Sequence, residues 1–127
     1  METQTLKKAT KRTLPAAVKL AVQAGLDKKA EDVLVLDLRE LVSFTDFFVI
    51  MSGRSTRQNQ AVYDAIKEVL KKKKVASLGA EGLDSGEWIL MDFGSFIVHI
   101  FSPRLRETYA LEMLWGDAPR LSFRVEA

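Results

Sequence analysis

Two apolar segments, 88–93 and 96–101, constrain the fold of this sequence most strongly, because Gly94-Ser95 between them is typical of a tight hairpin turn. Such a turn pairs Trp88 with Phe101 and Asp92 with Ile97, and side chains alternate across each strand. One face of the hairpin is then entirely apolar, consisting of Ile89, Met91, Phe93, Phe96, Val98 and Ile100. We expect this face to form core against helices.

The opposite hairpin face is mixed, with Trp88, Leu90, Asp92, Ile97, His99 and Phe101. A buried, unpaired carboxylate is costly, so Asp92 should be exposed or well hydrogen-bonded. This pattern predicts a sheet that is covered by helices on one side and partly open on the other. We interpret Trp88 as a binding residue, with a core position as the alternative. For His99 we favour a structural role, hydrogen-bonded to a neighbouring backbone group or carboxylate.

Further strands are predicted from continuous apolar runs at 33–36 and 47–51, which are typical of central strands. The glycine-rich stretch 76–86 is expected to be a loop, with or without a short strand. Residues 120–127 alternate between apolar and polar side chains and fit either an edge strand or a tail.

Three helices are expected. The first begins at Pro15, continues with apolar residues at helical spacing and ends at Gly25. The second begins at a capping box formed by Ser55 and Gln58. The third runs over residues 102–115 and ends at a glycine.

These elements predict a single α/β (α+β) domain with a mixed sheet of about five strands and helices packed mainly on one face. The expected organisation is a basic flexible tail at 1–13, a folded domain at 14–119, and a tail or edge strand at 120–127.

Composition narrows the possible functions. The chain has no cysteine and one histidine, which argues against disulfides and against thiolate or histidine metal sites. No apolar run approaches the roughly 20 residues that a membrane helix needs, and the basic N-terminus lacks the apolar segment of a secretory signal. We therefore expect a cytoplasmic protein without metal or cofactor.

Charge is divided unevenly along the chain. Residues 1–74 carry 15 basic and 9 acidic side chains, whereas residues 75–127 carry 4 basic and 8 acidic ones. The C-terminal half is therefore suited to a basic partner. The alternative is that the division only reflects the position of the lysine run 71–74, which we interpret as a solvated helix end.

Three motifs together resemble the ribosomal silencing factor (Iojap) family. They are Asp46-Phe47-Phe48-Val49-Ile50 with Ser52-Gly53, Ser55 and Arg57-Gln58; Trp88-Ile89-Leu90-Met91-Asp92-Phe93-Gly94 with Ile97-Val98-His99-Ile100-Phe101; and Arg106, Tyr109, Leu111-Glu112 and Leu114-Trp115-Gly116-Asp117-Ala118. The resemblance covers residues 14–119, and three motifs in the same order are much more specific than one glycine pattern.

The resemblance implies a nucleotidyltransferase-like fold without catalysis. It further implies binding to the large ribosomal subunit through its protein uL14, which sterically blocks joining of the small subunit and represses translation. Contact with nearby rRNA and formation of a homodimer are left open. The residues expected at the interface are Trp88, Leu90, Asp92, Arg106, Tyr109, Glu112 and Trp115; for Trp115, packing of the last helix against the sheet is an equal alternative.

Two alternative functions are suggested by other features of the sequence. An active nucleotidyltransferase is suggested by Gly53-Arg54-Ser55 before a helix, but it needs paired carboxylates for a divalent metal, and Asp37 and Asp92 each stand alone at a strand end. An RNA-binding module is suggested by the basic half, which lacks aromatic residues interleaved with the basic ones.

Overall fold

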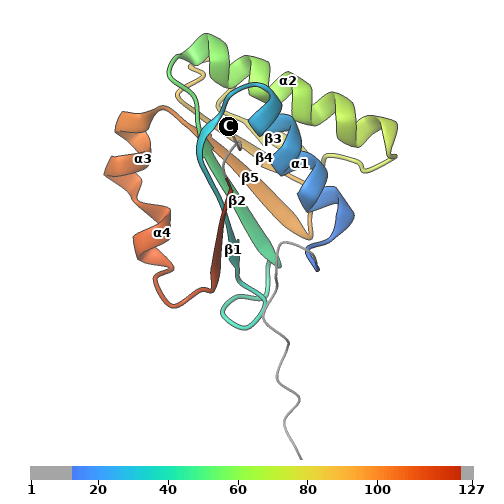
Figure 1. Cartoon of the computed structure of the whole chain (residues 1–127), viewed down its shortest axis with the longest axis vertical. Coiled ribbons are helices and arrows are strands. Elements are labelled where there is room, and N and C mark those ends of the chain that lie inside the picture. Colours follow the sequence, from blue (N-terminus) through green and yellow to red (C-terminus); the bar gives the residue numbers. More distant parts are fainter. Residues whose placement is uncertain (1–12, 124–127) are drawn as a thin grey trace, which may run out of the picture.

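The computed structural model describes residues 13–123, which form one α/β domain around a mixed six-stranded sheet in the order β3-β4-β5-β2-β1-β6 (Figure 1). The helices are α1 (Ala16–Asp27), α2 (Thr56–Lys72), α3 (Pro103–Tyr109) and α4 (Leu111–Leu114); the strands are β1 (Glu31–Asp37), β2 (Phe47–Ser52), β3 (Gly79–Glu81), β4 (Trp88–Asp92), β5 (Phe96–Phe101) and β6 (Arg120–Phe123). The predicted tail 1–13, apart from Thr13, and residues 124–127 lie outside the described residues.

The central hairpin has the predicted register. Strands β4 and β5 are antiparallel, with Trp88 opposite Phe101 and Asp92 opposite Ile97. Among the described strands, β2 and β5 form the one parallel pair, which makes the sheet mixed. The sheet has six strands rather than about five, because β3 is only 3 residues long and contains too few apolar residues to give a clear sequence signal. Strand β6 is the edge strand expected as one of the two alternatives for residues 120–127.

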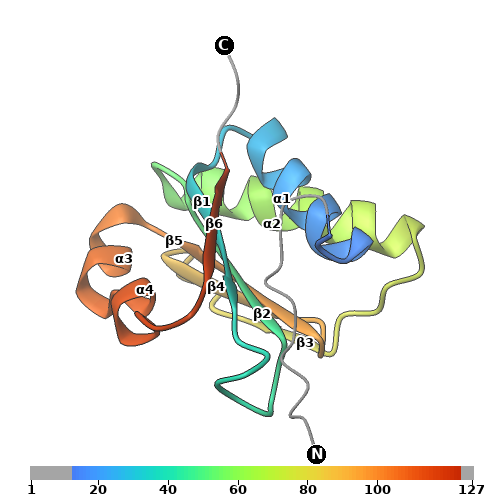
Figure 2. The same ribbon diagram turned by 60° about the horizontal axis from the view of Figure 1, so that its bottom comes forward.

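The apolar face of the hairpin is core, as predicted. Helices α1 and α2 lie together on this side of the sheet, whereas α3 and α4 lie on the other (Figure 2). Ile89, Val98 and Ile100 are completely buried beneath the two long helices. Burying a side chain of this size contributes roughly 1.5–3 kcal/mol, so this layer supplies much of the driving force for folding.

Helix α1 does not end at Gly25, and Pro15 is its N-cap rather than its first residue. The helix continues to Asp27, and Gly25 is buried inside it. A Cβ at this position would lie 2.5 Å from Sδ of Met51 on β2. The glycine therefore permits close packing of helix against strand, which a sequence pattern cannot distinguish from a helix stop.

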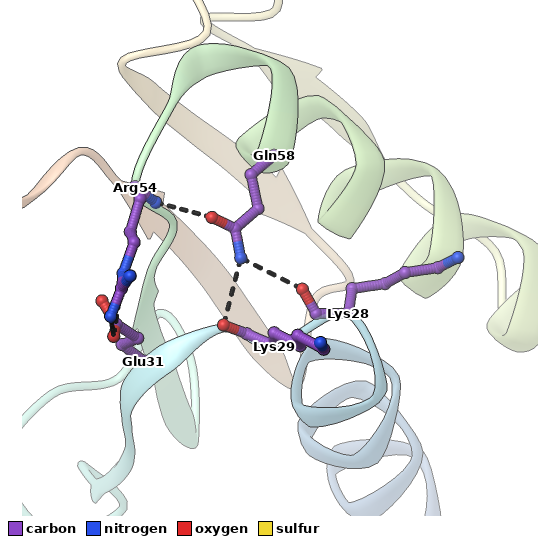
Figure 3. A network of polar contacts seen from close by, with 5 residues as sticks. All are labelled: Lys28, Lys29, Glu31, Arg54 and Gln58. Atoms are coloured by element: carbon purple, nitrogen blue, oxygen red, sulfur yellow. Dashed lines mark hydrogen bonds and ion pairs between the residues drawn. The ribbon is translucent and has the colours of Figure 1, made fainter.

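Helix α2 is capped by Ser55, whose Oγ accepts a hydrogen bond from the Gln58 backbone N–H at 3.0 Å. The reciprocal half of the predicted capping box is replaced by a longer-range contact. The Gln58 side-chain oxygen accepts from the Arg54 N–H, and its Nε2 donates to the carbonyl oxygens of Lys28 and Lys29 (Figure 3). One glutamine thus joins the start of α2 to the end of α1.

The predicted single helix over 102–115 is wrong, because the chain bends at Ala110 and forms two short helices. Ala110 has φ 44°, a left-handed conformation that costs an L-residue roughly 1–2 kcal/mol. Alanine is the best helix former, so its identity gives no warning of the bend. After the bend, α4 lies below α3 in Figure 1, and its Leu111, together with Trp115, packs against the smaller apolar cluster on this side of the sheet.

Candidate functional site

Aromatic side chains form a continuous layer on the second face of the sheet. Trp88 lies at its centre, with ring centroids 4.8 Å from Phe101 and 4.6 Å from Tyr109. His99 joins Trp88 to Phe48 on β2, at a centroid distance of 4.5 Å from the Phe48 ring. We call this set, completed by Trp115, the aromatic layer: Phe48, Trp88, His99, Phe101, Tyr109 and Trp115.

His99 is the polar member of this layer and is only 4% exposed. Its Nδ1 accepts a hydrogen bond of 3.1 Å from Nε1 of Trp88. The expected backbone or carboxylate partner is therefore wrong: the alternation across β4 and β5 brings an indole donor to the imidazole instead. Burial lowers the pKa of His99 to about 4, so the ring is neutral at physiological pH.

Trp88 is half-buried rather than sealed in the core. Phe101 and Tyr109 pack against it, and Leu90, which is also half-buried, follows it on the same face of β4. Tyr109 itself is 51% exposed. Sheet and helix α3 together thus present aromatic rings at the surface.

Asp92 lies at the other end of β4 from Trp88. Its carboxylate accepts a 2.8 Å hydrogen bond from the N–H of Gly94, and the Thr45 hydroxyl donates to the Gly94 carbonyl at 3.0 Å. Gly94 has φ 83°, so the turn needs a glycine there. Asp92 is half-buried, so its carboxylate is stabilised both by this hydrogen bond and by partial access to solvent, as the cost of an isolated buried carboxylate requires.

Arg106 and Glu112 form an ion pair across the bend at Ala110, with 3.0 Å between Nη2 and Oε2. A second nitrogen of Arg106 donates to the Ser52 hydroxyl at 3.2 Å, which attaches α3 to β2. Arg120 on β6 donates to the Glu112 carbonyl at 2.9 Å. These predicted site residues therefore bond to each other and hold the second face together.

Trp115 packs against the sheet. Its ring makes an edge contact with Phe48 at 6.4 Å, and it joins the smaller apolar cluster beneath α3 and α4. It remains half-buried, so its packing does not remove it from the surface.

Sequence reasoning missed several exposed apolar residues at the rim of this face. Met113 is 79% exposed and Leu114 69%, both on α4, and Phe44 before β2 is 60% exposed with its ring 6.3 Å from Phe48. The signal was present: residues 111–115 contain more apolar side chains than one short helix can bury on a single face.

A cleft of about 610 Å³ lies beside the ion pair, between α4 and the strands β1 and β6. Asp32, Arg106, Glu112 and Phe123 are among the residues that line it. Within residues 13–123 no group of three or more His, Asp or Glu side chains is arranged to hold a metal ion. In the same range no helix is both long and apolar enough to cross a membrane.

Comparison with known proteins gives consistent results. The model of the family "Ribosomal silencing factor during starvation" matches residues 11–127. Ribosomal silencing factor RsfS of Halalkalibacterium halodurans is 40% identical over 102 residues, 80% of this chain and 87% of the relative. Mouse "Mitochondrial assembly of ribosomal large subunit protein 1" is 38% identical over 91 residues, covering 69% of this chain and 40% of that protein. A crystal structure from Chromobacterium violaceum superposes with a TM-score of 0.77 at 38% identity, covering 87% of this chain and 92% of that one.

Proposed function

The chain belongs to the ribosomal silencing factor family, and on this premise we propose that it binds the large ribosomal subunit through protein uL14 and sterically prevents the small subunit from joining. The mouse relative, whose name refers to the large ribosomal subunit, supports the choice of subunit. Translation is repressed because protein synthesis requires the two subunits to join. A protein of this kind acts where ribosomes are, which fits the expected cytoplasmic location.

The observation that carries the proposal is the exposed aromatic and apolar surface around Trp88. Monomeric proteins rarely expose large contiguous apolar patches unless these bind something. Tryptophan and tyrosine dominate binding energy at protein interfaces, and both occur here in partly exposed positions. Met113 and Leu114 extend the apolar surface along α4.

Charge supports a basic partner. Glu107 on α3 and Asp117 after α4 are exposed, and Asp92 is partly accessible at the hairpin turn, whereas Arg104 is an exposed cation on α3. A cationic ribosomal protein would be attracted to this side, which raises the association rate and selects the orientation of docking. The apolar residues then supply most of the affinity.

The predicted interface residues have distinct roles in this proposal. Trp88, Leu90 and Tyr109 contact the partner directly, and Asp92 contributes charge at the rim. Arg106 and Glu112 maintain the bend that places Tyr109 over Trp88. Trp115 fixes α4 to the sheet and adds apolar surface beside it.

The hydrogen bonds of the candidate catalytic residues support steric blocking of subunit joining rather than catalysis. Asp37 is paired with Arg39 at 2.7 Å, and Asp92 is bonded within its turn. At the start of α2, where a phosphate would bind, Arg54 is paired with Glu31 at 2.8 Å (Figure 3). The groups that a nucleotidyltransferase would use for metal and phosphate are thus engaged in internal bonds.

The test is subunit reassociation on a sucrose gradient with purified subunits. We expect the protein to keep the subunits apart and to sediment with the large one, and Trp88→Ala to lose both effects. Tyr63→Ala is the matched control, because Tyr63 is a half-buried aromatic residue on α2, on the opposite side of the sheet. Normal reassociation in the presence of saturating wild-type protein would refute the proposal.

A further inference from the structure

We propose that His99 is a positioning residue of the docking surface, by which we mean the proposed partner-binding surface around Trp88, Leu90 and Tyr109. His99 fixes the orientation of the Trp88 indole and accepts the hydrogen bond of its N–H before any partner binds. This inference rests on the proposed function, because it assumes that Trp88 contacts the large subunit. Its new element is a role for a buried residue that itself touches no partner.

The geometry leaves the imidazole little freedom. His99 is 4% exposed, its ring meets Phe48 edge-on at 4.5 Å, and it lies parallel to Phe101 at 5.9 Å. Its Nδ1 is 3.1 Å from Nε1 of Trp88. A fixed acceptor therefore faces an indole whose ring is only half-buried.

The protonation state follows from this bond. Because Nδ1 accepts, a neutral His99 must carry its proton on Nε2. Nε2 is buried and has no hydrogen-bond partner among the described residues. Leaving a buried donor unsatisfied destabilises the folded state, because its hydrogen bond to water is lost without replacement.

The cost of the unsatisfied Nε2–H argues that His99 does more than fill space in the aromatic layer. A phenylalanine of similar size would fill the same space between Phe48 and Phe101 without burying an unsatisfied N–H. What histidine adds at this position is the acceptor for Trp88. The polar ring at this position therefore serves that bond.

The bond has a direct consequence for docking. An indole N–H that is hydrated in the free protein must lose its water when a partner covers it, and a freely rotating ring loses conformational entropy. His99 removes both costs in advance. The half-exposed indole then offers an apolar surface in a single orientation.

Two substitutions of His99 distinguish the effect of its hydrogen-bond acceptor from the effect of its ring volume. His99→Phe keeps the ring volume and removes the acceptor, whereas His99→Asn keeps an acceptor near Nδ1 and leaves a cavity. We expect His99→Phe to be the more stable variant and yet to bind large subunits about tenfold more weakly than wild type, as for one lost buried hydrogen bond. We expect His99→Asn to have the lower melting temperature and the tighter binding of the two. The opposite order of affinities, or wild-type affinity in His99→Phe, would overturn the inference.

A double-mutant cycle keeps the test decisive if His99→Asn fails to fold. In a Trp88→Phe background there is no indole N–H, so adding His99→Phe should change the affinity less than about twofold. A further loss of about tenfold there would show that His99 acts through something other than Trp88.

The free protein gives an independent readout. The chain has two tryptophans, so its ¹H–¹⁵N spectrum contains two indole N–H signals, and Trp115→Phe assigns them. We expect the Trp88 indole proton to resonate downfield and to exchange slowly, and to lose both properties in His99→Phe. An unchanged Trp88 signal would contradict the proposed bond.

These results also separate the two proposals. If Trp88→Ala binds large subunits normally, the docking surface itself is wrong. If Trp88→Ala abolishes binding and His99→Phe does not weaken it, only the role of His99 is wrong.

Discussion

The Arg106 guanidinium and the Glu112 carboxylate lie 3.0 Å apart across the bend that separates α3 from α4. The two side chains are 11% and 19% exposed, so solvent screens the pair only weakly. Arg106 also bonds Ser52 on β2, so one cation links both short helices to the sheet. The shape of the second face depends on this pair.

Removing one partner should therefore destabilise the protein. We expect Glu112→Ala to lower the free energy of unfolding by about 2 kcal/mol, because it leaves Arg106 partly buried without its carboxylate. Urea unfolding monitored by circular dichroism measures this. Glu68→Ala is the control: its pair with Lys72 is 3.5 Å long and more than 70% exposed on both sides, and its loss should cost less than about 0.5 kcal/mol. Equal effects of the two substitutions would contradict this view of the pair.

A glycine before β4 gives a steric prediction. Gly82 has φ 83°, and a Cβ there would lie 1.9 Å from the Trp88 carbonyl oxygen, a backbone atom. We expect Gly82→Ala to lower the free energy of unfolding by more than about 2 kcal/mol and to shift the start of β4. Gly79→Ala, where a Cβ meets nothing within 4 Å, should change stability by less than about 1 kcal/mol. Thermal unfolding of both variants measures these effects. A Gly82→Ala protein as stable as wild type would contradict the prediction.

His99 should make stability depend on pH in the acidic range. Its pKa is about 4 in the folded protein and about 6.5 in the unfolded chain. The unfolded state therefore binds the proton more readily, so the contribution of His99 is complete above pH 6.5 and is lost as pH falls toward 4. The loss amounts to about 3 kcal/mol. Urea unfolding of wild type and His99→Phe at several pH values isolates this effect, because the other titrating groups are common to both. Parallel pH profiles for the two proteins would disprove it.

Asp92 allows charge to be separated from turn structure. Asp92→Asn keeps an oxygen acceptor for the Gly94 N–H and removes only the charge. We expect a change in stability below about 1 kcal/mol, together with weaker large-subunit binding at low salt and a smaller difference at high salt, as for a screened rim charge. Cosedimentation across a salt series measures this. Asp92→Arg removes both the negative charge and the acceptor for the Gly94 N–H, so it should lower both the stability and the affinity for large subunits more than Asp92→Asn does. If Asp92→Asn bound large subunits as tightly as wild type at every salt concentration, Asp92 would lie outside the interface.

The amino-acid sequence alone specifies the local features of this fold, above all the hairpin of β4 and β5. The Gly94-Ser95 turn predicted the register of β4 and β5. The alternation in 88–101 predicted the side of the sheet that the long helices cover, because apolar side chains favour the buried face. The resemblance of three motifs then predicted the family that the comparisons show.

Tertiary structure decided what depends on atoms far apart in the sequence. Gly25 lies inside a helix, where its missing side chain leaves room for Met51. The chain bends at Ala110, and there Tyr109 meets Trp88 and Glu112 reaches Arg106. Periodicity encodes which face a residue occupies, whereas the partner of a polar group depends on which segments meet there. The bond between His99 and Trp88 exists only because the two strands pair in one register, and their residue types alone do not specify it.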